Sequence, residues 1–147
     1  MPAPLDLRNT VPHSPRKMLG DFVHLARMTD KARAKGAGLL GEYLYPCPMD
    51  MLLLEFLGID GETFLEVVQE REKDDDLLGW LKKNGHSHTS EEISRWNRTF
   101  LRRQPEDREG RERFTRRRNR IAPDRKDITT WVDLLDLDEG RDIPKRK

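Results

Sequence analysis

Residues 20–51, GDFVHLARMTDKARAKGAGLLGEYLYPCPMDM, join an amphipathic helical pattern to a proline-framed segment that carries the only cysteine. At about 100° per residue, the pattern predicts a helix over 22–35 with one apolar face. That face holds Phe22, Leu25, Ala26, Met28 and Ala32. The opposite side is a basic stripe, typical of a solvated face, made by His24, Arg27, Lys31 and Lys35. We expect this helix to be the centre of the fold.

Two charged residues of this helix, Asp30 and Arg33, interrupt its apolar arc. They stand three residues apart, so they are neighbours on the helix surface and are expected to pair. A charge in a buried or half-buried position must be paired or neutralised. The simpler interpretation is a structural ion pair that locks the helix to its neighbours. The alternative is that the pair belongs to a functional site.

The segment that follows, GEYLYPCPMD at 41–50, places Cys47 between two prolines that exclude helix before it. Pro48 suits the first position of a new helix, so Cys47 is expected to be its N-cap. A thiolate there would be stabilised by the helix dipole and free N–H groups. A free cysteine is, however, more often a small buried hydrophobe. The apolar neighbours of Cys47 favour burial, slow alkylation in the native protein, and a loss of stability in Cys47→Ser.

The rest of the chain predicts further helices and no strand, because no segment alternates with period two. After an extended N-terminal arm over 1–13, Ser14-Pro15 should open a short helix that Gly20 interrupts. Later helices are expected at 51–57, 63–71, 77–83, 90–103, within 102–126, and at 128–138. Asp60 and the capping box at Thr89 mark two of their starts. We therefore expect an all-α fold, a single compact domain over 1–147 with about seven helices around the one at 22–35.

Residues 102–126 hold ten arginines and one lysine against five acidic residues. Acids and arginines at i,i+4 (Asp107–Arg111, Glu109–Arg113 and Glu112–Arg116) suggest a self-paired, solvent-facing helix anchored by Phe114 and Ile121. No aromatic residue alternates with the arginines as a single-strand stacking platform would require. Nucleic-acid binding through 102–126 is therefore kept only as an alternative function.

The amino-acid composition narrows the classes of function that remain possible. Charged residues make up 37% of the 147 residues, yet the net charge is +1, so nothing pulls the whole chain toward nucleic acid or an anionic membrane. One cysteine excludes an internal disulfide, and His86-x-His88 lacks the further ligands of a zinc site. We expect no metal and no cofactor. Without an apolar leader or a long apolar run, a cytoplasmic location is expected.

These patterns define a candidate site, a polar cleft formed by the 22–35 helix and the 41–50 loop. The candidate residues are Arg27, Asp30, Lys31, Arg33, Glu42, Tyr45, Cys47 and Asp50. We expect a binding or ligand-sensing module for an anionic small molecule or an acidic protein partner. The alternative is a small enzyme that uses Cys47 or an acid/base group among Asp30, Glu42 and Tyr45. Binding is favoured because no nucleophile–base pair is visible in the sequence.

Several motifs also resemble one family of small bacterial proteins, known as a domain of unknown function. They are SPRKMLG, HLARMTDKARA, GEYLYPCPMD, LLEFLGID, the Trp96-Asn97 pair and DITTWVDLLDLDEG. The resemblance extends over essentially the whole chain. It implies a single bacterial domain in which the eight candidate residues, with Gly41 and Pro48, occupy motif positions. It brings no assigned activity, so no catalytic role follows from it.

Overall fold

The computed structural model describes residues 4–145 and confirms the expected all-α fold. Its seven helices are α1 (Leu25–Gly36), α2 (Pro48–Leu57), α3 (Gly61–Glu70), α4 (Asp74–Asn84), α5 (Ser90–Leu101), α6 (Arg108–Ile121) and α7 (Trp131–Asp138). Within the described residues no strand forms, and the only β-type pairing is an isolated bridge between Leu19 and Phe22.

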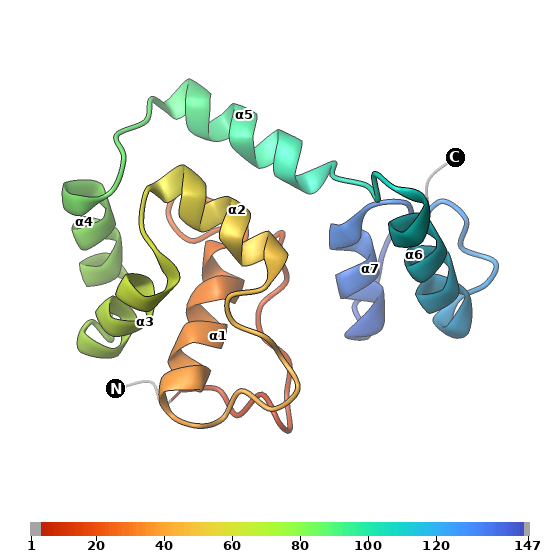
Figure 1. The fold of residues 1–147 in the computed structure, drawn as a ribbon, viewed down its shortest axis with the longest axis horizontal. Coiled ribbons are helices and arrows are strands. Elements are labelled where there is room, and N and C mark those ends of the chain that lie inside the picture. The colour runs from red at the N-terminus through yellow and green to blue at the C-terminus, as the bar shows by residue number, and fades with distance from the viewer. Residues whose placement is uncertain (1–3, 146–147) are drawn as a thin grey trace.

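The helices form two groups, which α5 connects along one edge of the molecule (Figure 1). The first group is α1 to α4, in which α1 packs against α3, and the second is the pair α6 and α7. The main core lies inside the first group and includes Leu25 and Met28 of α1 together with Phe64 of α3. A smaller core around Phe114 and Leu134 holds α6 and α7 together.

The central helix begins three residues later than the pattern predicts. His24, its N-cap, has a φ of 69°, and this left-handed conformation separates Phe22 and Val23 from the helix. The short helix expected after Ser14 does not form, because residues 15–20 contain turns, a bend and the isolated bridge of Leu19 instead. There the Ser14 side chain accepts a hydrogen bond from the Arg16 backbone N–H at 3.1 Å.

The predicted helix caps are confirmed where a polar side chain stands next to the helix start. Cys47 is the N-cap of α2, and its side chain and that of Asp50 form a reciprocal capping box. Asp60 caps α3 through the Thr63 N–H at 2.7 Å. Thr89 caps α5 in a second capping box. The cap signals were sufficient because each involves residues only three positions apart.

The arginine-rich segment forms α6, but its ion pairs differ from those expected. Glu109–Arg113 forms weakly at 4.0 Å, whereas Glu112 pairs with Arg108 at 3.2 Å instead of with Arg116. Asp107 caps the helix rather than pairing with an arginine four residues later.

The anchors of α6 and the start of α7 also differ from expectation. Phe114 is buried as predicted, but Ile121 is 43% exposed and does not anchor the helix. The last helix begins at Trp131 behind the N-cap Thr130, so the fully buried Ile128 precedes it.

Candidate functional site

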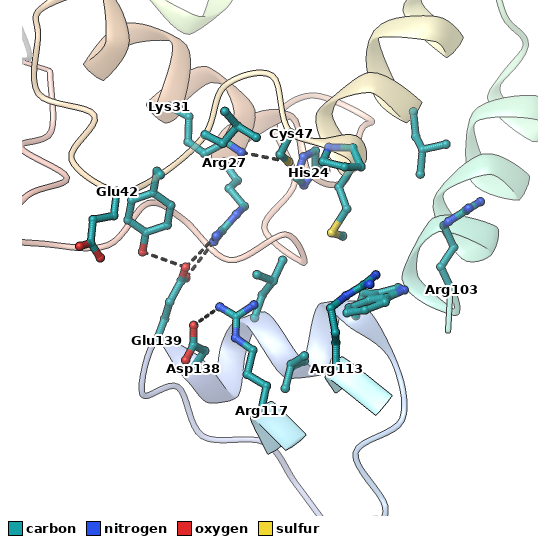
Figure 2. Close-up of a pocket in the computed structure, with 18 residues that line it drawn as sticks. His24, Arg27, Lys31, Glu42, Cys47, Arg103, Arg113, Arg117, Asp138 and Glu139 are labelled. Carbon is teal, nitrogen blue, oxygen red and sulfur yellow. Dashed lines mark hydrogen bonds and ion pairs between the residues drawn. The ribbon is translucent and has the colours of Figure 1, made fainter. Parts of the chain in front are cut away.

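A cavity of about 760 Å³ lies between the two helix groups (Figure 2). The first group contributes α1, the start of α2 and the loop before it, and the second contributes α6 and α7, with Arg103 just beyond α5. Its apolar wall is made by Leu44, Pro48, Met49, Leu52, Trp131, Leu134 and Leu135. Its polar lining is His24, Arg27, Lys31, Glu42, Tyr43, Cys47, Arg103, Arg113, Arg117, Asp138 and Glu139.

The basic stripe of α1 lines this cavity and is not solvated, contrary to the sequence interpretation. His24 is fully buried, and Arg27 and Lys31 are each only 2% exposed. The loop between α1 and α2 and the end of α7 cover this side of the helix through Cys47 and Glu139. Only Lys35 remains exposed, and its Nζ donates to the Tyr45 carbonyl at 3.0 Å.

Arg27 makes a bidentate ion pair with Glu139, which lies just past the end of α7. The two N–H···O distances are 2.8 and 2.7 Å, and the Tyr43 hydroxyl donates to the same carboxylate at 3.0 Å. Burial alone would raise the pKa of Glu139, but the Arg27 guanidinium outweighs it and lowers the pKa. Burial and the Glu139 charge raise the pKa of Tyr43 to about 12, so its hydroxyl stays protonated and donates.

Asp50 organises the other polar group of the cavity from a fully buried position. Its carboxylate contacts His24 Nε2 and Lys31 Nζ, both at 2.7 Å, and accepts from the Cys47 N–H at 2.9 Å. Burial disfavours the ionised form, but the His24 hydrogen bond and the Lys31 charge outweigh it, so the pKa of Asp50 falls to about 2. Asp50 is therefore ionised at neutral pH and makes His24 Nε2 the protonated nitrogen.

The second nitrogen of His24 has no such partner. Burial lowers the pKa of His24, so the ring is neutral, and with Nε2 protonated Nδ1 is an acceptor. Nδ1 is buried and receives no hydrogen bond from residues 4–145. Buried polar atoms rarely lack a hydrogen-bond partner, so the free acceptor of His24 sets it apart from the other residues that line the cavity.

Cys47 is half-buried and lines the cavity, so the expected burial of its thiol is wrong. Its Sγ lies 3.2 Å from Lys31 Nζ and accepts from the Asp50 N–H at 3.5 Å (Figure 2). The neighbouring Tyr45 takes the core position instead, with its hydroxyl donating to the Gly61 carbonyl at 2.9 Å. The sulfur is therefore an acceptor between an ammonium group and a helix N-terminus.

The structure places two other candidates, Asp30 and Arg33, away from this cavity. The expected ion pair between them is wrong. Asp30 accepts from the His13 N–H at 2.9 Å and contacts its ring at 2.6 Å, whereas Arg33 contacts Asp74 at 3.3 Å. Both line a separate cavity of about 530 Å³. Of the eight candidates, four line the large cavity, Asp50 lies directly behind them, and Asp30, Arg33 and Tyr45 lie elsewhere.

Sequence reasoning missed the contributions of α6, α7 and the end of α5. Glu139 lies 112 residues from Arg27, and no local pattern links the two. The charge-dense stretch at 102–126, whose sequence pattern indicates a solvent-facing helix, contributes three arginines to the cavity lining: Arg103, Arg113 and Arg117. The excess of basic over acidic residues at 102–126 was the only sequence signal for these cavity-lining arginines.

No group of three or more His, Cys, Asp or Glu side chains within residues 4–145 is arranged to hold a metal ion. The helices of this part of the chain are all too short or too polar to cross a membrane.

The fold and the cavity define a small helical protein with a polar, partly apolar pocket between two helix groups. Residues 9–141 match the family described as Domain of unknown function (DUF5069), and the chain belongs to that family. A comparison with curated proteins found no relative. The family description assigns no activity.

Proposed function

We propose that the protein is a binding module for an anionic small molecule with an apolar portion, held in the large cavity. The observation that carries this proposal is the lining itself. The lining combines five cationic side chains and three carboxylates with seven apolar residues. A volume of about 760 Å³ suits a small molecule, since such pockets usually measure about 300–1,000 Å³.

The charge available to a ligand comes from the α5–α6 side of the cavity. Arg27 and Arg117 are already paired, with Glu139 and Asp138 respectively. Lys31 is likewise held by Asp50. Arg27 and Lys31, whose ion pairs are buried, have little attraction left for a further anion.

Arg103 and Arg113 are different because their acidic partners are solvent-exposed and distant. The nitrogen–oxygen separations are 3.6 Å to Glu106 and 4.0 Å to Glu109, and both carboxylates are more than 80% exposed. Such pairs are weak and exchange readily. Figure 2 shows both arginines beside the cavity, one from the α5 side and one from α6. We assign the anion of the ligand to this pair of guanidinium groups.

The apolar part of the ligand would lie against the apolar lining residues. Met49 and Leu52 of α2 face this space together with Trp131 and Leu135 of α7. Flexible methionine and aromatic surfaces accept both aromatic and aliphatic groups. The ligand class that fits is therefore an amphipathic acid, such as an aromatic carboxylate or sulfonate.

Fluorescence titration with anilinonaphthalene sulfonate, an aromatic anion, tests this proposal. Arg113→Gln removes one partly screened charge and should raise the Kd about threefold. The double variant Arg103→Gln/Arg113→Gln should raise the Kd about tenfold. Arg116→Gln is the matched control, because Arg116 is exposed on the same helix and does not line the cavity. Equal affinities in all four proteins would overturn the proposal.

A further inference from the structure

The Cys47 sulfur faces the same cavity, and no part of the proposed binding function uses it. We propose that Cys47 forms a mixed disulfide with an anionic, low-molecular-weight disulfide bound in this cavity. The inference rests on the proposed function, because the same arginines would select the ligand. It adds a covalent reaction and a chemical class of ligand.

Two hydrogen-bond donors converge on Sγ. The Lys31 ammonium group, 3.2 Å away, is 3% exposed and is held in place by Asp50 at 2.7 Å. The backbone N–H of Asp50, in the first turn of α2, also points to the sulfur, at 3.5 Å. A thiolate is stabilised by a nearby ammonium group and by a helix N-terminus, and the thiolate is the species that attacks disulfides.

His24 provides a second and independent indication of a ligand. Its ring is fully buried, it lines the same cavity, and its Nδ1 has no hydrogen-bond partner among the described residues. A ligand that carries a neutral amide N–H would satisfy this acceptor. Neither the thiol of Cys47 nor the arginine pair accounts for the unpartnered nitrogen of His24. The position of the Cys47 sulfur and the free acceptor of His24 are therefore independent indications of a ligand.

The reaction balances without another reagent. The Cys47 thiolate attacks one sulfur of the bound disulfide, and a new sulfur–sulfur bond forms as the original one breaks. The second sulfur leaves with the electron pair as a thiolate. Cys47 is thereby oxidised by the ligand disulfide, which is reduced, and one half of the ligand stays attached inside the cavity.

The cavity lining selects which disulfides react. Arg103 and Arg113 attract a disulfide that carries carboxylates and repel one that carries amines. The apolar wall favours reagents with an aromatic or aliphatic body. Anionic disulfides should therefore react faster than neutral ones of similar size.

The test compares two aromatic disulfides, the dianionic dithiobis(nitrobenzoate) and the neutral dithiodipyridine. Both release a coloured product, and because the chain has one cysteine the colour reports Cys47 alone. Each rate constant is divided by the one measured for the urea-unfolded protein, which removes the intrinsic reactivity of the reagent. The native protein should then prefer the anionic disulfide by a factor on the order of 10.

Variants separate charge selection from general reactivity. Arg113→Gln, at a side chain that is 64% exposed and therefore safe for folding, should slow the anionic reagent about threefold and leave the neutral one unchanged. Arg116→Gln should change neither rate. Lys31→Met should slow both reagents, although this buried change also risks misfolding.

Two results would overturn the inference: equal normalised rates for the two disulfides, or no reaction of the native protein. If either occurs while Arg113→Gln still weakens naphthalene sulfonate binding, the sulfur chemistry fails and the binding function stands. If the charge effect is missing from both assays, the binding function fails as well.

Discussion

Arg27 and Glu139 form a bidentate ion pair that joins α1 to the end of α7 across 112 residues of sequence. Their side chains are 3% and 5% exposed, so the pair is almost completely removed from solvent. The pair lines the large cavity and connects the two helix groups. Arg16 reinforces the connection through ion pairs with Asp133 and Asp136 of α7.

Glu139→Ala should destabilise the protein strongly. It leaves the Arg27 guanidinium buried without its carboxylate, which typically costs about 3–5 kcal/mol. Arg27→Met in the same chain should recover part of this loss, because no buried charge then remains. Urea unfolding midpoints provide the measurement.

Asp30→Ala is the matched control for that experiment. The Asp30 side chain is 13% exposed, but its partner His13 is 52% exposed, so the loss of Asp30 leaves no buried charge unpaired and should cost less than the loss of Glu139. If Glu139→Ala cost no more than Asp30→Ala, the pair between α1 and α7 would not be buried in solution.

Acid should destabilise the protein in two steps. Burial lowers the pKa of His24 below 6.5, so below about pH 6.5 the unfolded chain binds a proton that the native state does not, and the free energy of unfolding falls. Asp50, with a pKa of about 2 against an ordinary 3.8, stabilises the native state above pH 4. That contribution is lost only as the pH falls toward 2.

His24→Asn isolates the first step. Asparagine tolerates the left-handed conformation of this residue and does not titrate. The urea midpoint should therefore fall less between pH 7 and pH 5 in His24→Asn than in the parent chain. An unchanged slope in His24→Asn would mean that His24 is not buried in its neutral form.

The half-buried position of Cys47 reverses the order of stability expected for a buried thiol. A serine hydroxyl can accept from the Asp50 N–H and from Lys31 in place of Sγ, and serine is a preferred N-cap. Cys47→Ser should therefore be close to the parent in thermal unfolding. Cys47→Ala removes the cap of α2 and should cost about 1 kcal/mol. A Cys47→Ala variant more stable than Cys47→Ser would contradict the cap.

The arginine-rich helix α6 should not bind nucleic acid tightly at physiological salt. Two of its acids, Glu109 and Glu112, pair with arginines of the same helix, and Arg117 pairs with Asp138 of α7. Anisotropy titrations with duplex DNA and single-stranded RNA at two salt concentrations measure this. Tight binding whose log–log salt slope is near −0.9 per phosphate contact would show that the remaining arginines form a nucleic-acid surface.

The sequence by itself determined the helical class and the N-caps of three helices, α2, α3 and α5. Cys47, Asp60 and Thr89 cap their helices through hydrogen bonds to residues three positions ahead, so the information needed for each cap is local. The same locality explains why Pro46 and Pro48 correctly marked the start of α2. Where a long-range contact intervenes, as at His24, whose N–H donates to the Pro15 carbonyl at 2.8 Å, the helix boundary moved.

Only the tertiary structure decided which face of α1 carries the site. A helical wheel shows that Arg27 and Lys31 share a face, but whether that face meets water depends on what packs against it. Glu139 and Cys47 cover it from distant and adjacent parts of the chain, and their carboxylate and sulfur are what make buried cations stable there. Burial is a property of the assembled fold, so no spacing within residues 22–35 could have revealed it.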